Sequence, residues 1–200
     1  MLTTSRRPLL AALLTGVPLA RAAAEIDPNR ATAFIQATGQ ELVAVLNSNL
    51  PVQDRRERVA AILRRAVDVE GTGRFILGRW WRTAAPAEQQ EYLRLFEETL
   101  IRNLASRFGE YQGVRFLLGR SQQRTEDDVL VTTVVERPNS GPINLDWRVG
   151  DVGGQPKIVD LVAEGTSLRL TQRSEYSAVV QRGGNQVGAL LTAMRQQLSR

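Results

Sequence analysis

The fold is decided by residues 129–149, which read VLVTTVVERPNSGPINLDWRV. The first seven residues are apolar or β-branched, which is typical of a strand that is covered on both faces. Residues 138–141 then predict a turn, because Pro, Asn, Ser and Gly favour turn conformations. From 143 to 149 apolar residues alternate with polar ones, which is typical of a half-buried strand. This stretch therefore predicts two antiparallel strands joined by a short turn.

Two further strands are predicted beside these. One precedes them and carries three alternating apolar residues, Val114, Phe116 and Leu118. The other follows Gly153 and Gly154 and covers residues 157–163. Asp127 and Asp128 are predicted to form the turn between the first two strands, since Asp is common in turns. The result is a four-stranded, mainly antiparallel sheet.

The rest of the chain shows a helical period. Apolar residues recur every three or four positions before and after the sheet. Residues 71–78 are predicted to be a loosened segment with a short apolar turn, because Gly71 and Gly73 disfavour a helix. Five segments are predicted to be helical: 28–47, from 51 onward, 86–109, 167–182 and 187–198. Helices, then an antiparallel sheet, then helices again indicate an α+β fold.

Residues 1–24 read MLTTSRRPLLAALLTGVPLARAAA and predict a signal peptide. Arg6 and Arg7 precede an apolar run over 9–19 that is too short to span a bilayer, and small residues follow. The paired arginines also match a twin-arginine signal, so both export routes remain open. The predicted organisation is a signal peptide over 1–24 and one domain over 25–200.

Composition excludes several function classes. The 200 residues contain no Cys and no His, which excludes Cys nucleophiles, Ser-His-Asp triads and structural zinc sites. The net charge of +5 falls to +2 when the three arginines of residues 1–24 are removed, leaving 23 basic and 21 acidic residues. The arginines are spread along the chain, so no nucleic-acid partner is expected. No catalytic, metal or cofactor site is predicted.

One enzymatic alternative stays open. Asp146 and Asp160 lie in predicted strands, and a carboxylate that faces a pocket can act as a base in a small α+β-cavity enzyme. Such residues more often form ion pairs, for which Arg148 and Arg173 are available. The apolar residues of the sheet suit either a solid core or a cavity, because both need the same side chains.

Two stretches resemble the MlaC/toluene-tolerance family. They are LGRWWRTAAP at 77–86, followed by Phe96, and IVDLVAEGTSL at 158–168. An Arg, an aromatic residue and a Gly pair also stand where that family has them, at Arg173, Tyr176 and Gly183-Gly184. The resemblance runs from about residue 26 to residue 198. Two positions depart from the family pattern: Gln155-Pro156 replaces a Trp, and Arg169 replaces an apolar residue.

The resemblance implies a periplasmic phospholipid carrier, not an enzyme, that maintains outer-membrane lipid asymmetry. It implies an NTF2-like fold with an apolar cavity between a curved sheet and the helices. Its implied partners are phospholipid, an outer-membrane lipoprotein and an inner-membrane ABC transporter complex with an MCE-type subunit. A sister branch linked to hopanoids leaves a hopanoid open as the cargo. Pattern and resemblance together predict these cavity-lining residues: Phe75, Leu77, Phe116, Leu118, Val131, Leu145, Trp147, Val162, Leu168, Tyr176 and Val179.

Overall fold

The computed structural model describes residues 26–106, 113–125, 127–138 and 140–199. The predicted signal peptide over 1–24 and the predicted helix end near 109 lie outside these residues. The elements, in chain order, are α1 (Pro28–Leu46), α2 (Val52–Ala66), α3 (Val69–Leu77), the 3-10 helix η1 (Gly78–Arg82), α4 (Pro86–Ala105), β1 (Arg115–Gln123), β2 (Asp128–Arg137), β3 (Ser140–Val152), β4 (Gln155–Ala163), β5 (Thr166–Ser167), α5 (Leu168–Arg182) and α6 (Val187–Leu198). Within the described ranges, no helix is both long enough and apolar enough to cross a bilayer.

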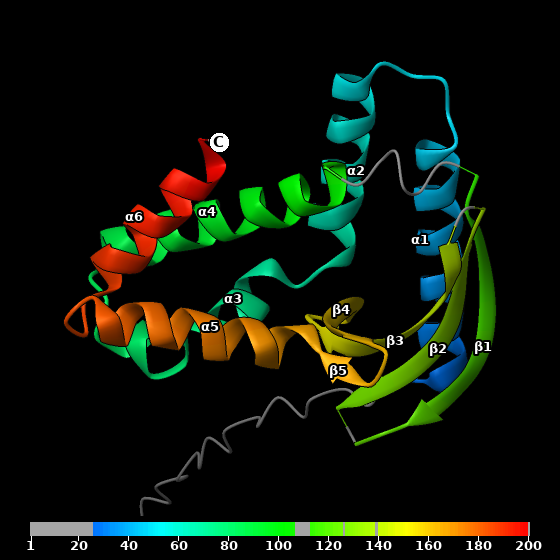
Figure 1. Ribbon diagram of the computed structural model, residues 1–200. Helices are drawn as coiled ribbons and strands as arrows, with labels where there is room; N and C mark the ends of the chain where they lie inside the picture. The colour runs from blue at the N-terminus through cyan, green and yellow to red at the C-terminus, as the bar shows by residue number, and fades with distance from the viewer. Residues whose placement is uncertain (1–25, 107–112, 126, 139, 200) are drawn as a thin grey trace, which may run out of the picture.

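The molecule has two halves that lie side by side (Figure 1). One half consists of the curved sheet with α1 beside it, and the other consists of α3, α4, α5 and α6. The sheet is antiparallel throughout, with the strand order β1-β2-β3-β4-β5. The α+β architecture is therefore confirmed. The sheet has five strands instead of the predicted four, because the two residues of β5 are too few to show an alternating pattern.

The strand register sorts the side chains onto two faces. Val131 lies opposite Trp147, and Thr133 lies opposite both Leu118 and Leu145. Because side chains directly opposite each other point to the same face, these residues share one face of the sheet. Helix α1 packs on this face through a buried cluster that contains Ile26, Ala31, Ile35, Ala66, Val129, Val131, Val149 and Ile158. We refer to this face of the sheet as the α1 face.

Local signals in the sequence explain how α1 is placed. The Asp27 carboxylate caps the helix by accepting a hydrogen bond of 2.9 Å from the backbone N–H of Asn29, and Pro28 occupies the first turn. Farther along, Gly39 allows a close approach to β1. A Cβ atom at this position would lie 2.6 Å from the ring of Phe116, so a larger residue would push α1 away from the sheet.

Helix α3 corrects the prediction of a loosened segment at 71–78. The helix begins after Asp68, whose carboxylate accepts a hydrogen bond of 3.0 Å from the backbone N–H of Gly71. Gly73 is buried within the helix, and its carbonyl accepts a 3.0 Å hydrogen bond from the Tyr92 hydroxyl. Packing against α4 therefore outweighs the low helix propensity of two glycines. The helix ends at Gly78, whose φ of +60° favours glycine.

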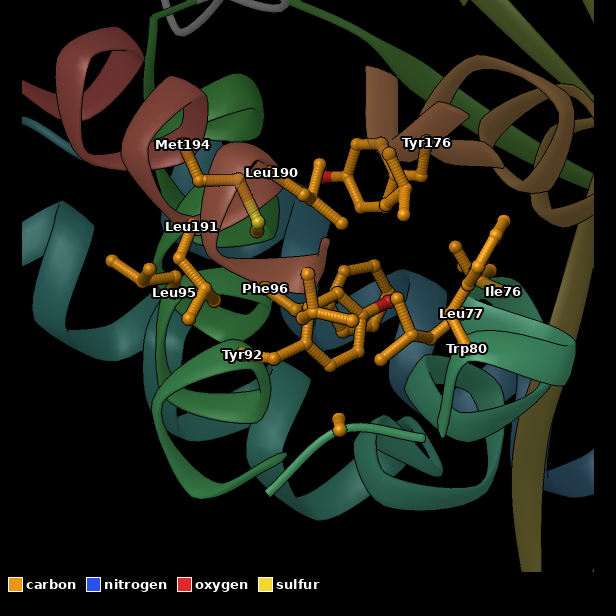
Figure 2. Packing of buried hydrophobic residues seen from close by; sticks show 13 residues of the cluster. Ile76, Leu77, Trp80, Tyr92, Leu95, Phe96, Tyr176, Leu190, Leu191 and Met194 are labelled. Carbon is orange, nitrogen blue, oxygen red and sulfur yellow. The ribbon is translucent and has the colours of Figure 1, made fainter. Parts of the chain in front are cut away.

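Buried side chains of the second half pack against one another between its helices (Figure 2). Tyr92 lies at the centre of these side chains, with its ring centroid 6.0 Å from that of Phe96 and 6.2 Å from that of Tyr176. We refer to the set of thirteen buried residues as the helical core: Ile76, Leu77, Trp80, Ala84, Tyr92, Leu95, Phe96, Tyr176, Val180, Val187, Leu190, Leu191 and Met194.

The two halves are joined at the outer edge of β4. Val67 forms an isolated parallel bridge with Ile158, and the backbone N–H of Asp68 donates to the carbonyl of Ile158 at 3.0 Å. The Thr72 hydroxyl then donates to the carbonyl of Val159 at 3.3 Å. The two residues between α2 and α3 therefore continue the sheet at β4, which fixes the helical core relative to the α1 face.

Candidate functional site

Five of the predicted cavity-lining residues share the α1 face: Phe116, Leu118, Val131, Leu145 and Trp147. Their burial differs along the strands. Val131 is fully buried beneath α1, whereas the side chains of Phe116, Leu145 and Trp147 are only half-buried. Leu118 is 37% exposed. The α1 face is therefore closed at one end and half-open at the other, where it presents apolar side chains.

Trp147 is held in place on this half-open part by the sheet itself. Its indole N–H donates to the Thr133 hydroxyl oxygen at 2.8 Å, and that hydroxyl donates to the carbonyl of Leu145 at 3.2 Å. The rings of Trp147 and Phe116 meet edge to face, with centroids 6.5 Å apart. Because the polar atom of the indole is already satisfied, the rest of the ring offers apolar surface.

Four other predicted residues belong to the helical half. Leu77 and Tyr176 are buried in the helical core, and Phe75 and Val179 pack against it. Tyr176 and Val179 also line a pocket of about 350 Å³ between α4, α5 and α6. Leu190 and Met194 form apolar parts of its wall. These four residues are not on the α1 face.

The last two predicted residues lie apart from both groups. Val162 is opposite Asp146 in the register, so its side chain is on the face of the sheet that α1 does not cover. Leu168 is the first residue of α5 and is 46% exposed. The structure thus divides the eleven residues between the α1 face, the helical core and two separate positions.

The structure contains a buried charge network, of which the sequence predicted only the pairing of Asp160 with Arg148. Asp128 was predicted to lie in a turn, but it is the first residue of β2, is 4% exposed and forms an ion pair with Arg148. Its partner Arg148 also approaches Asp160, with Nη1 3.9 Å from Oδ2. Burial lowers the pKa of the Arg148 guanidinium, and the positive charge of Arg169 lowers it further. In the sequence, the only indication of these ion pairs was the position of Arg148 among the polar residues of the alternating strand.

Asp160 is the centre of this network. Its carboxylate accepts hydrogen bonds from the Ser167 hydroxyl at 2.6 Å and from the backbone N–H of Arg169 at 3.2 Å. The Nε atom of Arg169 lies 3.3 Å from Asp160 Oδ2. The partners of Asp160 are therefore Arg148 and Arg169, not Arg173. This carboxylate holds the start of α5 onto β4.

The geometry argues against the enzymatic alternative. Asp146 lies opposite Thr132 and Asp160 lies opposite Arg148, so both carboxylates belong to the face away from the half-open apolar residues. Both oxygens of Asp160 also accept hydrogen bonds. Among the residues that the structure describes, no group of three or more acidic side chains is arranged to hold a metal ion.

Comparison with known proteins places the chain in a family. The profile of the family described as "MlaC protein" matches residues 36–196. Toluene tolerance protein ttg2D of Pseudomonas putida is 22% identical over 191 residues, which cover 92% of this chain and 86% of that protein. The intermembrane phospholipid transport system binding protein MlaC of Haemophilus influenzae is 21% identical over 138 residues, which cover 66% of this chain and 63% of that protein.

A solved structure has the same fold. The phospholipid-binding protein from Ralstonia solanacearum, determined in complex with a phospholipid, superposes with a TM-score of 0.76 at 23% sequence identity. The superposition covers 85% of this chain and 99% of that chain. Since the family profile spans well over half of the sequence and the fold agrees, this chain belongs to the MlaC family.

Proposed function

We propose that this protein is a periplasmic carrier that holds the acyl chains of a phospholipid against the half-open part of the α1 face. In this proposal it shuttles phospholipid between an outer-membrane lipoprotein complex and an inner-membrane ABC transporter with an MCE-type subunit. The observation that carries the proposal is the incomplete burial of Phe116, Leu118, Leu145 and Trp147 on one face of the sheet. A folded protein gains free energy by covering such residues, and an acyl chain can supply the cover.

The energetics of this arrangement suit a carrier. Burial of an alkyl chain contributes about 0.8 kcal/mol for each methylene group. Two tails of about sixteen methylenes each therefore gain on the order of 20 kcal/mol before the costs of ordering and desolvation. Binding of this strength needs no catalytic group. The phospholipid in the related Ralstonia solanacearum structure supports this choice of cargo.

Two adjacent leucines of β1 provide a matched test. Leu118 is on the α1 face and is 37% exposed, whereas Leu117 is on the opposite face and is 46% exposed. Both positions tolerate a charge similarly in the folded state, because both side chains already reach solvent. We expect Leu118→Asp to abolish lipid co-purification, and Leu117→Asp to retain it.

The measurement is native mass spectrometry of the exported protein, followed by extraction and identification of the bound lipid. A stoichiometric mass excess that resolves into phospholipid supports the proposal, and a hopanoid would reassign the cargo. The carrier function is contradicted if the wild-type protein is unloaded and takes up no lipid from vesicles. Equal lipid loads in the two leucine variants would contradict the assignment of the α1 face.

The shuttling step needs its own assay. Loaded protein is mixed with proteoliposomes that contain the inner-membrane transporter, and transfer of labelled phospholipid is followed over time. Transfer that depends on the transporter supports the proposed route. Transfer at the same rate to plain liposomes would contradict the need for a partner.

A further inference from the structure

The pocket between α4, α5 and α6 contains a polar group that the fold leaves without a partner. Tyr176 forms part of the pocket wall and is 7% exposed. The Tyr92 hydroxyl donates to the carbonyl of Gly73, whereas the Tyr176 hydroxyl forms no hydrogen bond within the described part of the chain. Figure 2 shows the Tyr176 hydroxyl pointing from α5 toward Leu190, which also lines the pocket. The pocket therefore offers a ligand a hydrogen-bonding group that the fold does not use.

A carboxylate lies close to this hydroxyl. Burial and, to a lesser degree, the negative charge of Glu175 raise the pKa of the Tyr176 hydroxyl to about 12, so it keeps its proton at neutral pH. Glu175 also lines the pocket. Its Oε2 atom accepts a hydrogen bond of 3.1 Å from the Gln172 amide, and its Oε1 atom has no partner among the described residues. The pocket thus presents a hydrogen-bond donor and a free acceptor from neighbouring positions of α5.

The rest of the pocket wall carries no charge. Its apolar part consists of Val179, Leu190, Ala193 and Met194, and its neutral polar part consists of Thr99, Asn103, Gln172 and Gln197. Among the described residues that line the pocket, Glu175 alone is charged. An anionic ligand would therefore meet a negative charge with no lining cation to offset it. A cationic ligand would lose hydration against the apolar wall, which is costly for a charged group.

We propose that this pocket binds a small neutral alcohol, whose hydroxyl group bonds to Tyr176 and Glu175 and whose apolar body packs against α6. An alcohol hydroxyl can accept from the Tyr176 O–H and donate to a Glu175 carboxylate oxygen at the same time. The volume of about 350 Å³ is at the lower end for small-molecule pockets, so the ligand is small. The site lies in the helical half and shares no residue with the α1 face, so the inference does not depend on the proposed carrier function.

A methionine reports directly on the pocket. The chain contains two methionines, Met1 in the predicted signal peptide and Met194 in the pocket wall. Exported protein with an isotope-labelled methionine methyl group therefore gives an NMR signal from the pocket, and n-hexanol is titrated into it. We expect the Met194 signal to shift with saturation, at a dissociation constant on the order of 1 mM for a ligand of this size. Hexanoate, which has the same chain length and a negative charge, should bind at least about tenfold more weakly.

Two neighbouring residues of α6 provide a matched pair of variants. Ala193 lines the pocket and Thr192 does not, although both are exposed. Both positions should tolerate a larger side chain in the folded state, because both already reach solvent. We expect Ala193→Phe to fill the pocket and abolish hexanol binding, and Thr192→Phe to retain it.

Two variants of α5 test the hydrogen bonds. Tyr176→Phe keeps the ring and removes only a hydroxyl that has no partner in the described residues, so the fold should be retained. Hexanol should bind about fivefold more weakly to this variant, as expected for the loss of one neutral hydrogen bond. Glu175→Gln keeps an acceptor and removes the charge, so hexanol should still bind and hexanoate should gain affinity.

Each result supports or overturns one part of the proposal. A wild-type protein without a saturable shift, or an Ala193→Phe variant with the wild-type affinity, overturns the pocket as a site. Equal affinities of the wild type and Tyr176→Phe overturn the role of the hydroxyl, and equal binding of hexanol and hexanoate overturns the preference for a neutral ligand.

A repeat of the titration with phospholipid-loaded protein separates this site from the carrier function. We expect loaded protein to bind hexanol with the same affinity as delipidated protein. If bound phospholipid excludes hexanol, the pocket belongs to the lipid-binding surface and the separate site is wrong. A protein that binds hexanol but takes up no phospholipid supports the pocket and contradicts the carrier function alone.

Discussion

The helical core and the α1 face are built from similar apolar residues, but they are covered to different degrees. Tyr92, Leu95 and Leu190 of the helical core are at most 2% exposed. On the α1 face, Val131 is equally buried, whereas Leu118 remains 37% exposed. A tightly packed core contributes to stability, whereas apolar residues that stay partly exposed on the α1 face cost stability until they are covered. The difference separates a core that stabilises the fold from a face whose apolar residues remain partly uncovered.

The largest effect is expected from a truncation at the centre of the helical core. Tyr92→Ala removes a fully buried ring that stacks on Phe96 and a hydroxyl that bonds to Gly73. We expect the free energy of unfolding to fall by about 4 kcal/mol, as for other aromatic truncations in cores. Leu145→Ala on the half-open face should cost less than half as much, because its side chain already contacts solvent.

Urea denaturation of the delipidated proteins, followed by circular dichroism, measures both values. Lipid is removed first because a bound ligand adds to the apparent stability. Equal losses in the two variants would show that the α1 face is as closed as the helical core. That result would contradict the comparison and the proposed binding surface together.

Alkaline pH should weaken the helical core selectively. Burial raises the pKa of the Tyr176 hydroxyl to about 12, with a further contribution from the charge of Glu175. In the unfolded chain this pKa is about 10, so the unfolded state loses its proton first. The contribution of this hydroxyl to the free energy of unfolding is therefore fully present below pH 10. It is lost between pH 10 and 12, and the loss is at most about 3 kcal/mol. Burial also raises the pKa of Tyr92, which acts in the same direction.

Tyr176→Phe tests this expectation, because it removes one of the two ionising groups and keeps the ring. Urea unfolding at pH 8, 10 and 11 should show a smaller decrease in stability for the variant than for the wild type. An unchanged pH dependence would mean that Tyr176 ionises as easily in the folded protein as in the unfolded one.

The smallest change in the free energy of unfolding is expected from a substitution where α1 contacts the sheet. In Gly39→Ala the new Cβ would lie 2.6 Å from the Phe116 ring and displace it. The clash is expected to cost about 2 kcal/mol. The higher helix propensity of Ala offsets about 1 kcal/mol of this cost, so the free energy of unfolding falls by about 1 kcal/mol. Gly188→Ala in α6 is the matched control, since its Cβ would meet only Glu88 Oε1 at 3.8 Å.

The two glycine variants should therefore differ in sign. Gly188→Ala should stabilise the protein slightly, and Gly39→Ala should destabilise it and change the lipid load. Thermal unfolding and native mass spectrometry of both variants measure these effects. A stabilising Gly39→Ala would show that α1 is free to move away from Phe116.

Alternation and helical periodicity predicted most of the fold. The strand that carries Ile143, Leu145, Trp147 and Val149 was placed correctly, because one covered face imposes a period of two on the sequence. Five predicted cavity residues share the α1 face for the same reason. Helix α3 was missed because its stability comes from the buried contact of Gly73 with Tyr92, and local propensity does not report contacts between distant residues.

The buried charges were predicted only in part: Arg148 was a candidate partner of Asp160, but the pairing of Asp128 and of Arg169 was not predicted. Asp is a residue type that is common in turns, and only the pairing of β2 with β3 brings Asp128 close to Arg148. The same limit applies to the division of the apolar residues between two halves. Burial on the α1 face and burial in the helical core select the same residue types, so only the three-dimensional arrangement separates Tyr176 from Trp147.

The buried charge network has a consequence for how this sequence can evolve. Asp128, Arg148, Asp160 and Arg169 link β2, β3, β4 and α5 through shared ion pairs. Loss of one charge leaves its buried partner uncompensated, which is far more costly than loss of the pair. A substitution at one of these positions is therefore tolerated best when a neighbour in the network changes with it. Among relatives, the four positions should covary, and chains with an apolar residue at 169 should differ elsewhere in the network.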